Sequence, residues 1–216
     1  MRKRGLLIFD LDGTLFQTDQ VSIPAVQEAL RHAGYAPPPG EEIAEFFGRP
    51  PADFYAWIHA RYPGISPEVV ASIDEWELCL VRDRGALYPG VGEMLAELRR
   101  QVSHMAICSN GPGPYVQEVV RSHGLAPFFD DIRHRLTDED NKPVMVAELL
   151  ARLPGRPAAV IGDRWDDIAA AHENGLLAIA SAYGFGNTEE HAGADAVVRS
   201  PREIVPLVGR WLNGRP

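Results

Sequence analysis

The sequence predicts an α/β protein: a parallel sheet core with an inserted α-helical subdomain. Three short apolar runs end abruptly in small or acidic polar residues, at Leu6–Phe9, His104–Cys108 and Ala158–Ile161. Runs of this length are typical of strands buried within a parallel sheet. From Leu87 onward, single helical patterns alternate with such strands, which indicates parallel pairing through helical crossovers.

The segment between the first strand and Leu87 interrupts this alternation. Residues 17–86 contain amphipathic helical patterns, separated by turns rich in proline and glycine. The expected helices are Pro24–Ala33, Glu41–Phe47, Ala52–Arg61 and Pro67–Asp83. We therefore divide the chain into a core, residues 1–16 and 87–216, and a helical insert, residues 17–86.

The remaining helices and strands of the core are predicted from the spacing of apolar residues and from the turn residues between them. Helices are expected at Val91–Arg100, Pro114–His123, Pro143–Arg152, Asp166–Asn174 and Pro201–Trp211. Besides the three runs above, strands are expected at Asp131–Arg135, Leu177–Ala180 and Ala196–Val198. The alternation is that of a sheet covered by helices.

Composition excludes several classes of protein. The 216 residues are 45% hydrophobic and 24% charged, which is ordinary for a globular protein. A formal net charge of −9 argues against a nucleic-acid partner. No apolar run approaches the length of a membrane span, and Leu6–Phe9 is too short for the apolar region of a signal peptide. We expect a cytoplasmic monomer or homodimer.

Polar residues at the strand ends are the candidate site. In a parallel sheet the carboxyl ends of the strands share one edge, so Asp10, Asp12, Ser109 and Asp163 are expected to converge there. Carboxylates in that position can hold a divalent cation, and one of them can attack an electrophile. Taken singly, these residues also fit structural roles: Ser109 as a turn or N-cap residue, Asp163 as part of a capped helix start.

These residues carry a family resemblance. Asp10-Leu11-Asp12-Gly13-Thr14, Ser109, Lys142 and the pair Asp163 and Asp167 match, in order, the four motifs of the haloacid dehalogenase superfamily of phosphohydrolases. The resemblance extends from about Leu6 to about Val198. It implies a Rossmann-like catalytic core with a helical cap that emerges after the first strand, as in the phosphoglycolate-phosphatase-like branch.

The resemblance also implies a role for each motif residue. Asp10 is the expected nucleophile, Asp12 the proton donor and acceptor, and Lys142 a fixed cation beside the phosphate. Mg²⁺ is the expected cofactor, held by Asp10, Asp163 and the backbone carbonyl of Asp12. The remaining expected roles are phosphate binding by Ser109 and the backbone N–H of Asn110, support of the turn by Thr14, and orientation of Lys142 or a metal-bound water by Asp167.

Three further residues lie outside the motifs. Arg49, in the turn Phe47-Gly48-Arg49-Pro50, is a candidate substrate contact that could pair with a carboxylate or a second phosphate. No motif role is expected for Asp166 or Arg164, and Arg164 is expected to face solvent.

The function that these residues favour is hydrolysis of a small soluble phosphomonoester by a Mg²⁺-dependent phosphatase, through an aspartyl-phosphate. The alternatives are a phosphomutase of the same fold and a catalytically inactive binding module. Hydrolysis of a carbon–halogen bond is disfavoured because that reaction has no need of Asp12. The expected partner is a small phosphorylated metabolite.

Overall fold

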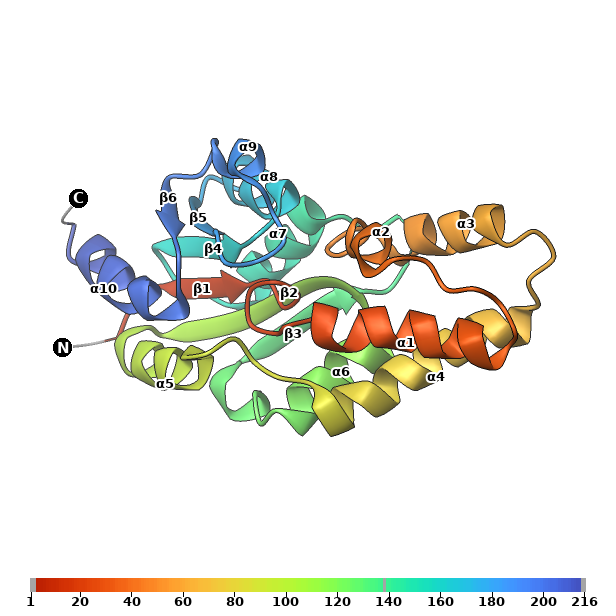
Figure 1. Ribbon diagram of the computed structural model, residues 1–216. Helices are drawn as coiled ribbons and strands as arrows, with labels where there is room; N and C mark the ends of the chain where they lie inside the picture. The colour runs from red at the N-terminus through yellow and green to blue at the C-terminus, as the bar shows by residue number, and fades with distance from the viewer. Residues whose placement is uncertain (1–2, 138, 215–216) are drawn as a thin grey trace.

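The computed structural model describes residues 3–137 and 139–214 of the chain. Residues 1–2, 138 and 215–216, which the sequence pattern assigns to the core, lie outside the described residues. Within the described part, six parallel strands form one sheet (Figure 1). They are β1 (Leu6–Phe9), β2 (His104–Pro112), β3 (Asp131–Arg135), β4 (Ala158–Gly162), β5 (Leu177–Ser181) and β6 (Ala196–Val198).

Helices precede and follow these strands, which confirms the predicted α/β class. In the insert they are α1 (Asp19–His32), α2 (Gly40–Ala44), α3 (Pro51–Arg61) and α4 (Pro67–Arg84). In the rest of the chain they are α5 (Val91–Gln101), α6 (Gly113–Ser122), the 3₁₀ turn η1 (Ala126–Phe128), α7 (Lys142–Arg152), α8 (Trp165–Glu173), α9 (Thr188–His191) and α10 (Pro201–Leu212).

Both faces of the sheet are covered by helices. Side chains alternate along a strand, so Leu7 and Phe9 point to one face while Leu6 and Ile8 point to the other. The first face packs against α5, α6 and α10, and the second against α7 and α8, as Figure 1 shows. This burial on both sides explains why β1 is apolar throughout.

The order of the strands, β3-β2-β1-β4-β5-β6, places β1 at the centre of the sheet. Phe9 is in register with Ile107 of β2 on one side and Ile161 of β4 on the other. The chain proceeds from β1 to one half of the sheet and then returns to the other half, so the strand order switches at β1. Crevices at such switch points are where open α/β sheets bind ligands.

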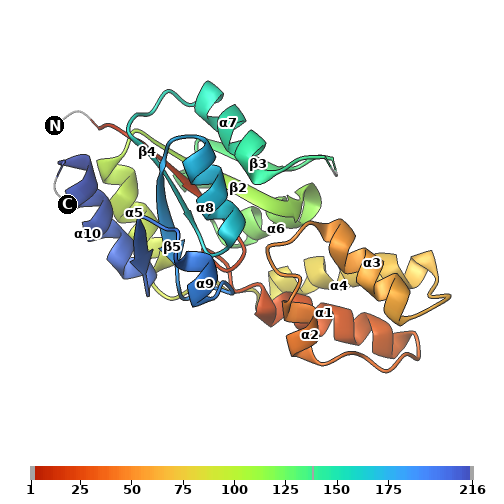
Figure 2. The same cartoon turned by 90° about the horizontal axis from the view of Figure 1, so that it is seen from above.

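Helices α1–α4 lie together beyond the carboxyl ends of the strands (Figure 2). They form an apolar cluster of their own that includes Val26, Leu30, Ile58 and Ile73. We call these four helices the cap. The closest pairing within it is between α1 and α4, which run side by side.

Several elements differ from the sequence prediction. Helix α2 ends at Ala44 and not at Phe47, because the N–H groups of Phe46 and Phe47 bond to carbonyls only three residues earlier. Helix α9 and the turn η1 are not among the expected elements. Helix α1 begins at Asp19 and not at Pro24, because the Thr18 carbonyl already accepts bonds from the N–H groups of Val21 and Ser22. Pro24 therefore sits inside the helix, where it forfeits one backbone bond. Strand β2 runs on to Pro112, beyond the expected end at Cys108, because its last residues pair with β3 across a register shift.

In the part of the chain that the structure describes, no helix is long and apolar enough to cross a membrane.

Candidate active site

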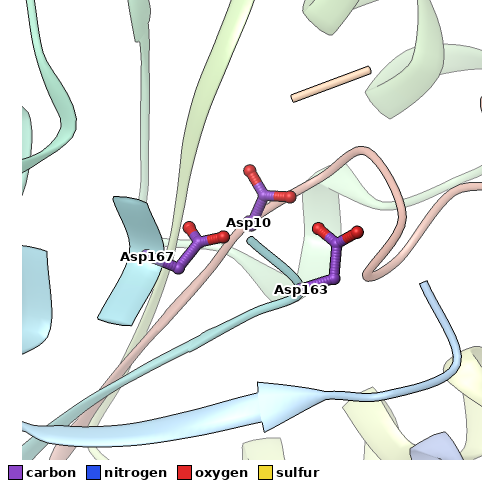
Figure 3. Close-up of side chains that lie close together, drawn as sticks. All are labelled: Asp10, Asp163 and Asp167. Atoms are coloured by element: carbon purple, nitrogen blue, oxygen red, sulfur yellow. The ribbon is translucent and has the colours of Figure 1, made fainter. Parts of the chain in front are cut away.

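Three carboxylates meet at the carboxyl edge of the sheet (Figure 3). Asp10 follows β1, Asp163 follows β4, and Asp167 lies in the first turn of α8. One oxygen from each lies within 4.8 Å of the others, and all three residues are buried. The structure thus brings Asp10 and Asp163 together, as the strand ends predicted, and adds Asp167 to them.

Lys142 supplies a positive charge within this cluster. It is the first residue of α7, whose N-cap Asn141 accepts a bond from the N–H of Val144. Its Nζ lies 2.8 Å from Oδ1 of Asp10 and 2.5 Å from Oδ1 of Asp167. The Lys142 side chain is only 1% exposed, so this charge is held in place and shielded from water.

Burial is the main cause of the shifted pKa values of the carboxylates in this cluster. It raises the pKa of Asp10 to about 8, although Lys142 lowers that pKa and the nearby Asp163 and Asp12 add to the rise. Burial, together with the neighbouring Asp167, raises the pKa of Asp163 to about 7. Burial alone would lower the pKa of Lys142, but the adjacent carboxylates hold it well above its ordinary value. The cluster carries more negative charge than Lys142 can balance.

Two oxygens of the cluster have no hydrogen-bond partner among the described residues: Oδ2 of Asp10 and Oδ1 of Asp163. By contrast, both oxygens of Asp167 are engaged, Oδ1 by Lys142 and Oδ2 by the N–H of Arg164 at 3.1 Å. Buried carboxylate oxygens without donors are costly unless a cation neutralises them. The donor set of Asp10 and Asp163 therefore fits a hard divalent cation such as Mg²⁺.

The backbone around Asp163 is closely packed. Its Oδ2 accepts bonds from the N–H groups of Phe185 at 2.6 Å and Gly186 at 3.3 Å. Gly13 has a φ of +77°, and a Cβ there would lie 2.3 Å from the same oxygen. Only glycine adopts this positive φ readily and also leaves room for the Asp163 side chain, which explains the glycine that follows Asp12.

Asp12 belongs to a different network. Its Oδ1 accepts bonds from the hydroxyls of Thr18 at 2.6 Å and Tyr115 at 2.5 Å. Its Oδ2 lies 3.4 Å from the hydroxyl of Ser109. Burial raises the pKa of Asp12, against the opposing effect of these bonds. The hydrogen bonds of Asp12 thus go to groups outside the three-carboxylate cluster, although its charge still raises the pKa of Asp10. Thr14 is buried nearby, and its carbonyl accepts a bond from the hydroxyl of Tyr183.

A second set of contacts joins the core to the cap. The side-chain amide of Asn110 donates to the carbonyl of Gly48 at 2.9 Å and to Asp166 at 2.7 Å. Arg164 donates to the carbonyl of Phe47 and, at 2.8 Å, to Glu190. The expectation that Arg164 faces solvent is wrong: its side chain is 12% exposed, because the cap turn and Glu190 cover it.

A cavity of about 120 Å³ lies between the cap and the core. Asp10 and Asp12 line its core side, and Arg49, which is exposed, lines its cap side. The guanidinium of Arg49 sits 5.7 Å from the ring centre of Phe46. The predicted nucleophile, the predicted proton donor and the predicted cap residue therefore share one cavity.

Sequence reasoning missed Thr18, Tyr115 and the cap-binding side chain of Arg164. Thr18 had a weak signal, since a threonine before an acidic residue and an apolar pattern suits a helix N-cap. No sequence signal identified Tyr115 or Arg164, because their partners are 103 and 117 residues away along the chain.

Comparison with known proteins agrees with this geometry. The model of the haloacid dehalogenase-like hydrolase family matches residues 5–175, and the chain belongs to this family. A phosphoglycolate phosphatase of Vibrio cholerae is 29% identical over 207 residues, covering 90% of this chain and 92% of that protein. The tyrosine-protein kinase PtkA of Mycobacterium tuberculosis is also 29% identical, over 85% of this chain and 64% of its own length.

Solved structures show the same architecture. A crystal structure described as a predicted phosphoglycolate phosphatase from Haemophilus somnus superposes with a TM-score of 0.81 at 21% identity, covering 96% of this chain and 99% of that one.

Within its family, the chain is a phosphatase that acts on phosphoric monoesters and resembles phosphoglycolate phosphatases. The resemblance inferred from the four motifs is confirmed.

Proposed function

We propose that the protein hydrolyses a small phosphomonoester in a Mg²⁺-dependent reaction that passes through an aspartyl-phosphate on Asp10. The observation that carries this proposal is the pair of unpartnered oxygens on Asp10 and Asp163, beside Lys142 and at the end of a cavity. Bound there, Mg²⁺ supplies charge neutralisation between the carboxylate and the phosphate dianion.

Asp10 is the proposed nucleophile because it is the carboxylate of the cluster that also lines the cavity. In the first step an oxygen of Asp10 bonds to phosphorus and the bond to the leaving oxygen breaks. Lys142, 2.8 Å from Asp10, offsets the negative charge on both partners.

Asp12 is the proposed general acid and base. Its raised pKa favours a protonated carboxyl that can give its proton to the leaving oxygen. In the second step the ionised Asp12 takes a proton from the water that attacks the aspartyl-phosphate. Thr18 and Tyr115 fix one of its oxygens, so the other is oriented toward Ser109 and the reacting group.

The remaining site residues have supporting roles in this proposal. Ser109 and the backbone N–H of Asn110 hold phosphoryl oxygens, and the backbone carbonyl of Asp12 joins Asp10 and Asp163 as a metal ligand. Asp167 orients Lys142, since its oxygens are already engaged by Lys142 and the N–H of Arg164. Thr14 supports the turn after β1, and Arg49 attracts the anionic substrate at the cavity.

The proposal is tested by phosphate release from p-nitrophenyl phosphate and from a panel of small phosphomonoesters, with Mg²⁺ and after exhaustive chelation. We expect release only with Mg²⁺, and a loss of several powers of ten in Asp163→Asn. Full activity after chelation would contradict the metal site. Formation of an isomer from a sugar phosphate without release of phosphate would instead establish the phosphomutase alternative.

A further inference from the structure

The cap side of the cavity has its own polar group, which the proposed chemistry does not use. Thr18, the N-cap of α1, and the α1 residues Ser22 and Val26 follow one another at intervals of four residues, and all three line the cavity. On α4, Ile73 and Glu77 are also four residues apart and line it as well. These two stripes face each other across the α1–α4 contact.

Ser22 and Glu77 meet where the stripes face each other. The hydroxyl of Ser22 donates to Oε1 of Glu77, which fixes the carboxylate in the cavity wall. Burial raises the pKa of Glu77 to about 7, and the negative charges of Asp12 and Asp74 contribute to this rise. A hydrogen-bond donor or a cation placed beside Glu77 would stabilise its ionised carboxylate, which burial disfavours.

The charge of the cavity wall is unbalanced on the cap side. Asp74 and Glu77 both line it, and Asp74 also accepts a bond from the hydroxyl of Tyr55 at 2.7 Å. Among the described residues that line the cavity, Arg49 alone is cationic, and it is exposed. Asp74 is exposed as well, whereas Glu77 is partly buried, so an anionic group that passes Arg49 and reaches the partly buried wall meets the carboxylate of Glu77.

We propose that Glu77, held by Ser22, is a specificity-determining residue that selects leaving groups carrying a hydroxyl or ammonium donor and rejects those carrying a carboxylate. This inference rests on the proposed phosphatase activity and names its substrate class. When the phosphate of the substrate is bound at Asp10, the leaving group points toward the cap. There Glu77 accepts a hydrogen bond from the hydroxyl or ammonium group, and apolar residues such as Val26 and Ile73 contact the carbon chain. Phosphoglycolate, despite the chain's resemblance to phosphoglycolate phosphatases, is a poor fit to this wall.

The test compares four phosphomonoesters of nearly equal size, assayed with Mg²⁺ at pH 8, where Glu77 is ionised. They are phosphoethanolamine, ethylene glycol monophosphate, ethyl phosphate and 2-phosphoglycolate. We expect kcat/KM for the ammonium and hydroxyl esters to exceed that for 2-phosphoglycolate by at least about tenfold, with ethyl phosphate between them. The ammonium and hydroxyl esters show separately which donor Glu77 prefers.

The variant Glu77→Gln removes the charge and keeps the shape. It should lower kcat/KM for phosphoethanolamine about tenfold while changing that for ethyl phosphate by less than about twofold. Glu75→Gln, an exposed glutamate of the same helix that does not line the cavity, is the matched control and should leave all four values unchanged.

The outcomes separate the inference from the function on which it rests. Turnover of all four esters with 2-phosphoglycolate as the best substrate would overturn the role of Glu77 and leave the phosphatase intact. Absence of turnover with every ester, p-nitrophenyl phosphate included, would overturn both. If Glu77→Gln does not fold, the ranking of the four esters by the unmodified enzyme still decides the question.

Discussion

Lys142 is surrounded by more negative charge than it can neutralise. Its Nζ lies 2.8 Å from Asp10, 2.5 Å from Asp167 and 3.8 Å from Asp166, all within the same buried region. Such a group is stable only if further charge compensation or protonation occurs. The identity of each member of the group therefore affects both the chemistry and the stability of the fold.

Replacing Asp10 by asparagine should abolish turnover and preserve the fold. The amide is not a nucleophile toward phosphorus, so kcat should fall by several powers of ten. Lys142 keeps its bond to Asp167, and asparagine matches aspartate in size, so the circular dichroism spectrum should match that of the unmodified protein. A purified Asp10→Asn protein that retains more than about a tenth of kcat would show that another residue is the nucleophile.

Lys142→Ala should cost more activity than Ser109→Ala. Lys142 contacts the proposed nucleophile directly, whereas the hydroxyl of Ser109 lies 3.4 Å from Asp12 and shares phosphate binding with backbone donors. We expect a difference of about tenfold or more in kcat/KM, measured side by side with saturating Mg²⁺. A larger loss in Ser109→Ala would reverse this ranking of the two residues.

At the level of the elements, one turn of the cap is fixed to the core. The carbonyl of Phe47 accepts a bond from Arg164, and the carbonyl of Gly48 accepts one from Asn110 at 2.9 Å. The rings of Phe47 and Phe185 also pack at 4.8 Å between centres. Because Arg164 directly follows Asp163, these contacts couple the position of the cap turn to the edge of the sheet that carries the candidate site.

Arg164→Met should loosen this turn without disturbing the sheet. Methionine keeps an apolar stem beside Gly48 but loses the bonds to Phe47 and Glu190. We expect hydrogen exchange at the amides of residues 46–49 to be roughly tenfold faster. Arg100→Met, which removes an exposed arginine of α5, is the control and should leave exchange in the turn unchanged. Equal exchange in both variants would show that Arg164 does not secure the cap.

For the whole molecule, the sequence predicted those features that depend on local patterns. The apolar run Leu6–Phe9 and the polar residues after it predicted the central strand and the position of the candidate site, because parallel strands end at a common edge. Contacts between distant segments could not be predicted in this way. Tyr115 and Asp12 meet only because α6 packs against β2 and β3, and Arg164 meets Phe47 only because the cap packs against the core.

The charge of the site also bears on global stability. The chain has a formal net charge of −9, and among the described residues Asp10, Asp163 and Asp166 each have a buried carboxylate oxygen without a hydrogen-bond partner. The pKa of Asp10 is raised to about 8 and that of Asp163 to about 7, both by burial. Between about pH 4 and pH 8 the metal-free folded protein therefore binds more protons than the unfolded chain. The free energy of unfolding of the metal-free protein therefore falls as the pH rises through this range.

Mg²⁺ should reverse this trend, since it pairs with the ionised carboxylates that rising pH produces. At a concentration of a hundred times its Kd, Mg²⁺ adds about 2.7 kcal/mol, which raises Tm by about 5–10 °C in a chain of this size. We expect this rise at pH 8 and a smaller one at pH 5.5, where protons compete for Asp10 and Asp163. Thermal melts with and without Mg²⁺ at the two pH values measure this rise in Tm. In Asp163→Asn, the rise should lose most of its dependence on pH. An increase in Tm that is equal at both pH values, or greater at pH 5.5, would mean that Mg²⁺ binds elsewhere.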